Sequence, residues 1–381
     1  MKNNMKTINN YNFLAFTFIF LVISTLYTFP MFLKYIIFFS LIFFNTVNRI
    51  HIRIILSFFL IITLSITASS RKYGFVSDDL NSYYYAYIDI MNYGLSFDME
   101  YFRSTEVLLP TFYYILSFSA IKSPVFLMFA ESLFLYFLFY FWLELLIKKY
   151  NLQNPNFLIV ISFLLISIYY PTQLTRQFLS VLILMYIFVI DGIFFKVLLS
   201  ILSLLTHTTA LLYIGIYIFT IFKKNSIKIV LSVIFLLIAY YIANEIIFKA
   251  YPLEGYINYY LKNSLHSFPI NERSLIIIFL FIASFIFKGH TVYKNIKYNI
   301  MFLIVLYLIL SKYGLIAERI FLPLLSIGLG TLMYLVLYHK PKYIMIISLM
   351  LMINHFLIEL KVSGILWDTF FIYGQPFYYF N

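Results

Sequence analysis

The sequence predicts an all-α, polytopic integral membrane protein with about 11 full spans and additional short re-entrant or broken segments. Hydrophobic residues make up 63% of the 381 positions and charged residues only 11%, whereas soluble domains are about a quarter charged. The chain has room for about a dozen passes of roughly 20 residues with short loops, but not for a separate soluble domain as well. We therefore expect one transmembrane domain over residues 1–381.

The candidate spans are separate apolar runs, several of them shorter than a full crossing. The first run follows Lys2 and Lys6 as a signal peptide would, but no small-residue cleavage site appears, so we interpret it as a retained span. A short run can still cross where the bilayer thins locally. The expected spans are residues 13–29, 31–44, 50–68, 125–147, 157–170, 173–190, 229–248, 275–287, 300–310, 320–338 and 344–360.

The positions of Lys and Arg predict the orientation of these spans, because cytoplasmic loops carry an excess of both residues. All the clusters can be cytoplasmic if residues 106–121, which we read as interrupted by Pro110, do not cross. Residues 197–222 must also enter and return as a broken pair around 205–208. Such segments are tolerated only in protein or beside a water-filled cavity. The clusters comprise Lys2, Lys6, Arg49, Arg53, Lys148, Lys149, Lys196, Lys223, Lys224, Lys228, Lys288, Lys294, Lys297, Lys340 and Lys342.

Two polar loops are expected on the outer side, at residues 69–123, including the re-entrant segment, and at residues 249–273. Most acidic residues fall on this side, so any chemistry is expected to face outward. The net charge of +12 comes largely from Lys between apolar runs and does not indicate a nucleic-acid partner. The outer acids are Asp78, Asp79, Asp89, Asp98, Glu100, Glu106, Glu254, Glu272 and Glu318.

Three arginines stand where outer helices are expected to begin: Arg176, Arg319 and Arg273. A charge in mid-bilayer costs at least about 2.5 kcal/mol, so each should lie at the interface or in a polar cavity. One interpretation is snorkelling to lipid headgroups, or, for Arg319, a local pair with Glu318. The other is a clamp on a diphosphate, since guanidinium offers a planar, bidentate fork.

His207 lies at the expected break in an apolar stretch, flanked by threonines. An intramembrane imidazole is a functional candidate, and its near-neutral pKa suits a general base. The alternative is a His that satisfies the backbone of a helix break. The chain has no Cys and no His pair at metal-ligand spacing, so we expect neither a metal nor a cofactor.

The early outer loop carries candidate sugar and acid–base contacts. Asp78 and Asp79 precede an aromatic segment that contains Tyr83, and Glu106 opens the re-entrant segment. Each acid has a second interpretation as a helix cap. Glu131 falls within an apolar run, where it is interpreted as an interhelical hydrogen-bonding group.

Taken in order, these motifs resemble the EpsG/Wzy family of O-antigen and exopolysaccharide polymerases over roughly residues 78–319. Val107 follows Glu106 where the family pattern has Gly. The motifs are Ser77-Asp78-Asp79-x-x-x-Tyr83, Glu106-Val-Leu-Leu, Tyr170-x(5)-Arg176-Gln177, Thr206-His207-Thr-Thr-Ala210 and a late Arg319.

The resemblance implies an enzyme of the bacterial inner membrane that acts on its periplasmic or outer face. It would transfer a growing glycan from undecaprenyl diphosphate to a lipid-linked repeat unit, and a chain-length regulator is a candidate partner. Arg176, Arg319 and Arg273 would bind diphosphate. His207 or Asp79 would be the base, with Glu106 beside it. The remaining candidates, for sugar binding, are Asp78, Tyr83 and Gln177.

Three rival functions remain open. An O-antigen ligase or a membrane O-acyltransferase also uses outward-facing His and Arg, although a ligase usually has a larger late outer loop. A lipid-linked oligosaccharide flippase would be a transporter, with ionisable residues along both halves of the bundle. Here the candidate residues gather near one face, which favours the polymerase.

Overall fold

The computed structural model describes residues 30–43, 50–71, 73, 79–95, 106–166, 170–207, 210, 214, 272–294, 297, 300, 304 and 327–366. This part of the chain is helical and contains no β-strand. The helices are α2 (Pro30–Phe43), α3 (Ile50–Ser69), α4 (Asp79–Tyr93), α5 (Leu108–Ser117), α6 (Pro124–Tyr150), α7 (Pro155–Leu164), α8 (Tyr170–Gln173), α9 (Thr175–Met185), the 3₁₀ turn η2 (Tyr186–Phe188), α10 (Ile193–Leu204), α14 (Glu272–Ile286), α17 (Leu329–Val336) and α18 (Pro341–Leu366).

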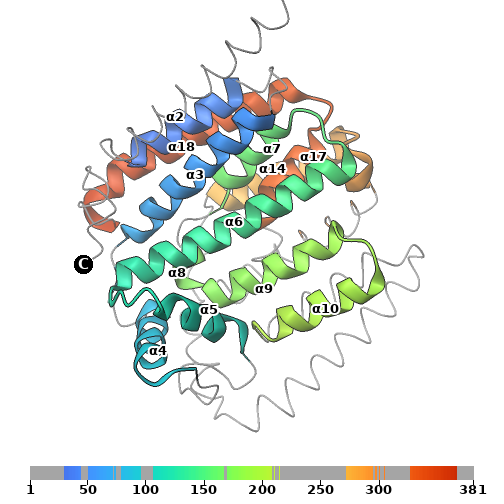
Figure 1. Cartoon of the computed structure of the whole chain (residues 1–381). Helices are drawn as coiled ribbons and strands as arrows, with labels where there is room; N and C mark the ends of the chain where they lie inside the picture. The colour runs from blue at the N-terminus through green and yellow to red at the C-terminus, as the bar shows by residue number, and fades with distance from the viewer. Residues whose placement is uncertain are drawn as a thin grey trace, which may run out of the picture.

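The long helices pack side by side in a bundle, and the shorter helices α4, α5 and α8 gather at one of its ends (Figure 1). Helix α3 lies between α2 and α6, while α7 packs on α17, α18 and α2. Helix α10 folds back along α9. At the lower left of Figure 1, α4 and α5 pack on each other and on the start of α6, with a small apolar core of their own.

Local sequence signals explain where α6 begins and ends. The Ser123 side chain accepts a hydrogen bond from the Phe126 backbone N–H, and Pro124 occupies the first turn, where its missing N–H costs nothing. At the other end Lys148 and Lys149 face the negative pole of the helix, and Asn151 adopts a left-handed conformation at φ 48°. The helix is therefore bounded as its sequence predicts.

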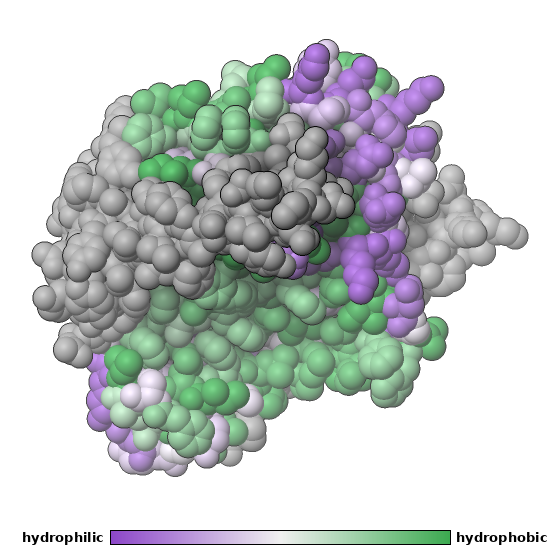
Figure 2. Space-filling model, turned by 45° about the horizontal axis from the view of Figure 1, so that its top comes forward, coloured by the Kyte–Doolittle hydropathy of each residue, from purple (hydrophilic) through white to green (hydrophobic). Residues whose placement is uncertain are grey.

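Two of the described helices, Ile50–Ser69 and Pro124–Tyr150, are long and apolar enough to cross a bilayer, and seven others are shorter apolar helices. Large apolar side chains are exposed on several of these helices, for example Phe194 and Phe195 on α10 and Ile353 on α18. Figure 2 shows hydrophilic side chains along one side of a mostly apolar surface. These features are those of a membrane protein. The number of spans remains a prediction.

Three expectations about helix boundaries are wrong. Pro110 does not interrupt its segment, because it lies in the first turn of α5, where no intrahelical N–H bond is lost. The expected span 173–190 is shorter than predicted: the backbone of Leu174 leaves the helical region at ψ 35°, so the helix starts at Thr175, and it ends in a 3₁₀ turn at Phe188. The expected helix 157–170 ends at Leu164.

The two segments that were expected not to cross are short or broken. Helix α5 has 10 residues, which corresponds to about 15 Å, half of the roughly 30 Å hydrocarbon thickness. Helix α10 ends at Leu204, and residues 205–207 form a turn. The returning half of this pair lies largely outside the described residues, as do residues 249–271 of the second outer loop.

The lysine clusters and the helices α4, α5 and α8 lie at opposite ends of the bundle. Lys122 is the exception, because it follows Ile121, whose carbonyl accepts from Tyr87 of α4. At the lysine end, Lys149 contacts Asp191 at 2.6 Å, and the rings of Tyr150 and His290 are 6.4 Å apart. Near the same end, Arg53 of α3 forms two hydrogen bonds, of 2.9 and 2.8 Å, with Glu144 of α6. Because α6 rises about 1.5 Å per residue, Lys149 is about 27 Å from Glu131, which contacts α5 and α9.

Candidate functional site

Arg176 lies at the end of the bundle where the short helices meet, on the first turn of α9. The break at Leu174 ends α8 and starts α9 beside it, so the arginine is placed on a helix terminus rather than within a span. Its Nη1 donates to Glu106 Oε2 at 2.7 Å, and its Nε donates to the Tyr83 hydroxyl at 3.3 Å. The Arg176 side chain is 22% exposed, so its guanidinium is partly accessible while it is held by two residues distant in sequence.

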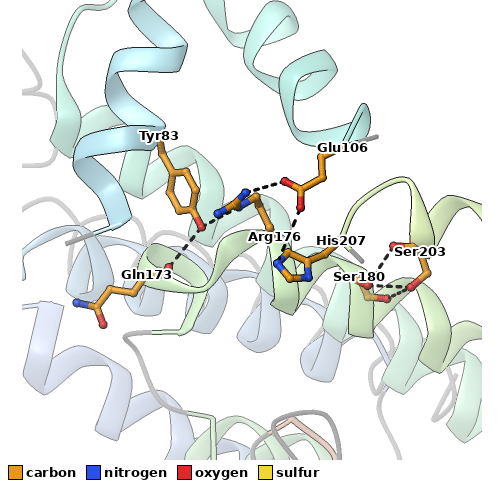
Figure 3. A network of polar contacts seen from close by, with 7 residues as sticks. All are labelled: Tyr83, Glu106, Gln173, Arg176, Ser180, Ser203 and His207. Carbon is orange, nitrogen blue, oxygen red and sulfur yellow. Dashed lines mark hydrogen bonds and ion pairs between the residues drawn. The ribbon is translucent and has the colours of Figure 1, made fainter. Parts of the chain in front are cut away.

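Glu106 and His207 complete this cluster, which we call the Arg176 cluster: Tyr83, Glu106, Arg176 and His207. His207 Nε2 lies 3.9 Å from Glu106 Oε1, and Figure 3 shows the carboxylate between the guanidinium and the imidazole. Glu106 is almost fully buried, at 2% exposure. Its side chain does not cap α5, whose N-cap is Val107 without a side-chain hydrogen bond, so the capping interpretation of Glu106 is wrong.

The spacing of Glu106 and His207 is set by contacts outside their side chains. The Val107 backbone N–H donates to the Leu205 carbonyl at 2.8 Å, which joins the start of α5 to the turn after α10. One turn back, Ser203 Oγ donates to the Ser180 carbonyl at 2.8 Å, and the two hydroxyl oxygens are 2.9 Å apart. These serines let α9 and α10 approach closely, as small polar residues do in membrane bundles.

Tyr83 connects α4 to the cluster. Its hydroxyl accepts from Arg176 and donates to the Gln173 carbonyl at 3.5 Å, while the Arg176 guanidinium carbon lies 5.4 Å from the ring centroid (Figure 3). Burial raises the pKa of Tyr83, and this outweighs the opposing effect of Arg176. The phenol therefore stays protonated and keeps its donor for the carbonyl.

Glu131 of α6 is a residue of this region whose contacts could not be predicted. It is fully buried, and its carboxylate accepts from the Tyr113 hydroxyl of α5 and from Thr175 Oγ1 of α9 at 3.1 Å. Thr175 directly precedes Arg176, so Glu131 holds the two helices that bear the ion pair. The interhelical hydrogen bonding expected of Glu131 is confirmed, but its partners leave no periodic signal in the sequence.

Arg71 is a second buried charged residue of this region that the sequence analysis did not select. It follows the end of α3, is fully buried, and donates from Nε to Thr172 Oγ1 at 2.7 Å and from Nη2 to the Thr172 carbonyl at 3.1 Å. These bonds attach α8 to α3 just before the break that leads to Arg176. A charged residue that follows a span is normally predicted to lie at the membrane interface, so the sequence carries no signal that Arg71 is buried.

The remaining candidates are only partly described. Asp79 opens α4 one turn before Tyr83, and Gln177 is buried beside Arg176. Arg273 lies in the first turn of α14, but its side chain is not among those described, and Asp78 and Arg319 lie outside the described residues. Within the described part, no three His, Asp or Glu side chains are grouped as a metal site.

The fold and the cluster define a class: helical membrane proteins with a polar site where discontinuous helices meet at one end of the bundle. The chain belongs to the EpsG family, whose family model matches residues 54–374. Membership in this family indicates a polysaccharide polymerase type of function. No curated protein and no solved structure matches the chain.

Proposed function

We propose that this protein polymerises surface polysaccharide by transferring a growing glycan from undecaprenyl diphosphate to a lipid-linked repeat unit. The reaction would take place on the outer face of the bacterial inner membrane. One observation carries the proposal beyond family membership: Arg176, Glu106 and His207 come from three separate segments and meet at the end of the bundle opposite the cluster that contains Lys149. If the lysines are cytoplasmic, the cluster faces outward.

The donor determines what such a site must supply. Breaking the bond between the anomeric carbon and the diphosphate leaves negative charge on the departing lipid diphosphate, so a fixed cation beside it lowers the barrier. Arg176 suits this role because guanidinium pairs with phosphate oxygens in a planar fork and stays charged. Its orientation is set by Glu106 and Tyr83, so little reorganisation is needed when the substrate binds.

Access for a lipid substrate requires a site at membrane depth that opens sideways or at the interface. Helix α5 is too short to cross, and α8 and α9 are separated by a break, so three helix termini lie near the Arg176 cluster. Irregular backbone at this depth is tolerated where it lines a cavity. This arrangement supports a binding site for a lipid-linked sugar, with Arg273 and Arg319 as further proposed diphosphate contacts.

The acceptor repeat unit would lie on the side of α4. Tyr83 and Asp79 are on this helix one turn apart, and Asp78 immediately precedes it. We assign them to the sugar, since carboxylates bind hydroxyl groups and tyrosine rings stack on pyranose faces. No cofactor is needed in this scheme, because the diphosphate is already an activated leaving group.

Deleting the gene and resolving the attached glycans on a gel tests the function. We expect the long-chain ladder to disappear while a single attached repeat unit remains. Loss of all attached glycan would indicate a ligase or a flippase instead, and an unchanged ladder would contradict the proposal.

The role of Arg176 is tested by complementing the deletion strain with variants. Arg176→Ala should abolish the ladder, and Arg176→Gln, which keeps a donor for Glu106, separates loss of charge from loss of packing. Lys148→Ala is the matched control. Lys148 is an exposed cation near the C-terminal end of α6, away from the Arg176 cluster. Full chain length in both Arg176 variants, at equal protein level in the membrane, would rule out the diphosphate role.

A further inference from the structure

The two carboxylate oxygens of Glu106 have different surroundings. Oε2 accepts from Arg176 at 2.7 Å, whereas Oε1 has no hydrogen-bond donor among the described residues. Glu106 is buried, with only 2% of its surface exposed. A buried acceptor without a donor is unfavourable and is rare in native proteins, so it calls for an explanation. A bound ligand that donates a hydrogen bond to Oε1 would satisfy this oxygen.

The distance between Glu106 Oε1 and the His207 imidazole suits one bridging hydroxyl group. His207 Nε2 lies 3.9 Å away (Figure 3), which is too long for a hydrogen bond. An oxygen placed about 2.8 Å from both atoms would subtend an angle of about 90° between them, a normal angle for a hydroxyl that makes two hydrogen bonds. The Val107–Leu205 backbone bond and the Ser180–Ser203 pair join the segments that carry the two side chains, and so limit how closely these can approach.

We propose that this gap binds the acceptor sugar hydroxyl and that Glu106 Oε1 is the general base. This inference rests on the proposed function. The hydroxyl oxygen attacks the anomeric carbon of the donor glycan, its proton passes to Oε1, and the bond from the anomeric carbon to the diphosphate oxygen breaks. Undecaprenyl diphosphate leaves with the bonding electron pair. His207 brackets the hydroxyl from the other side and orients it.

The Arg176–Glu106 pair couples the two halves of this reaction. Before the transfer, the carboxylate neutralises the guanidinium at 2.7 Å. When Oε1 takes the proton, Glu106 becomes neutral and the positive charge of Arg176 is no longer compensated. At that moment the leaving diphosphate gains negative charge. The base and the cation are therefore most effective as an adjacent pair, which explains why a buried acid faces a diphosphate-binding arginine.

A second buried acceptor extends the acceptor site. Gln177 is 5% exposed and its Oε1 also has no hydrogen-bond donor among the described residues. Gln177 lies three residues before Ser180, on the same face of α9, one turn closer to the end where His207 follows α10. A second hydroxyl of the acceptor sugar would satisfy it. The inferred ligand is therefore a sugar with two hydroxyl groups directed into the bundle.

The decisive variant is Glu106→Gln, which keeps the shape and an acceptor for Arg176 but cannot take a proton. We expect the initial rate of polymer formation in membranes to fall about 10²- to 10⁴-fold, the usual contribution of a general base. Glu106→Asp should retain part of the rate. Glu144→Gln, which changes a carboxylate outside the cluster, should retain the wild-type rate per folded molecule.

Sodium formate provides a readout that a structural role would not change. Formate should partly restore polymer formation by Glu106→Ala, since it supplies the missing carboxylate, but should not restore Arg176→Ala. Two outcomes would overturn the inference: a wild-type rate for Glu106→Gln, or no rescue of a Glu106→Ala protein that melts at the wild-type temperature. Both leave the proposed function intact if gene deletion still removes the ladder, so the two failures can be distinguished.

Discussion

Two partly buried Arg–Glu pairs, near opposite ends of the bundle, differ in how completely the carboxylate is satisfied. Arg53 donates to both oxygens of Glu144, and Tyr140 donates to Oε1 as well, at 2.8 Å. Arg176 donates to one oxygen of Glu106, and the other faces His207 at 3.9 Å. When both carboxylate oxygens already accept hydrogen bonds from the protein, neither is left for a substrate. When one oxygen has no donor, a substrate can donate to it. The comparison separates an ion pair that joins helices from one that is poised for chemistry.

The largest expected contrast comes from neutralising each acid in turn. Glu144→Gln should lower the free energy of unfolding by about 2 kcal/mol, because hydrogen bonds to a charged group are lost, and leave the polymer rate per folded molecule unchanged. Glu106→Gln should lower the polymer rate strongly and cost less stability, because Glu106 accepts one hydrogen bond from Arg176 whereas Glu144 accepts three. Thermal unfolding in detergent and polymer formation in membranes measure the two effects. Equal effects of both variants on both quantities would remove the distinction.

Replacing each arginine by lysine sharpens the comparison. Arg53→Lys cannot keep both bonds to Glu144 and should cost about 1 kcal/mol of stability. Arg176→Lys cannot reach Glu106 and Tyr83 together, and it loses the planar fork for phosphate, so we expect the polymer rate to fall at least about tenfold. Membrane levels of both proteins serve as controls. A fully active Arg176→Lys would show that only the charge matters.

Tyr113→Phe tests whether the support behind the cluster matters for activity. The change removes a donor from buried Glu131, so we expect a loss of about 1 kcal/mol in stability and a several-fold lower polymer rate. Tyr136→Phe is the matched control: Tyr136 is buried on α6, the helix that carries Glu131, and packs against Phe163 of α7. If both variants lose activity equally, the effect is one of general packing.

The smallest effect is expected at the exposed pair Lys149–Asp191. The pKa of Asp191 lies below its usual range because Lys149 donates to it at 2.6 Å. A depressed pKa means that any stabilisation is present at neutral pH and lost as the pH falls through that pKa. The Asp191 side chain is 87% exposed, so solvent screens the pair. Asp191→Asn should therefore change neither the unfolding temperature nor the polymer rate at neutral pH.

Helices with long apolar runs and capping signals were predicted closely, as α2, α3 and α6 show. The separation of the Lys149 end of the bundle from the candidate residues also followed from the sequence, because the positive-inside rule acts on each loop independently. Breaks inside apolar stretches were harder. Pro171 lies within α8 and the break comes at Leu174, a residue that carries no breaker signal.

Candidate site residues were predictable only where an ionisable group interrupted an apolar run. This criterion selected Arg176 and His207, and Glu106 was selected at the start of a short segment. It could not show that the three meet, since 70 residues separate Glu106 from Arg176. The burial of Arg71 and the partners of Glu131 were missed, because hydropathy periodicity reports the burial of a face and not which side chain on another helix completes a hydrogen bond.

The backbone bond from Val107 to Leu205 affects how freely position 107 can vary among related sequences. Val107 has φ −99° and ψ −32°, a conformation open to every L-amino acid, and it contributes only its N–H to the bond. The valine that stands in place of the expected glycine therefore leaves the position of Glu106 unaffected. Proline is the exception, since it has no N–H to donate. Position 107 should thus tolerate wide substitution while the residues on either side of the gap do not.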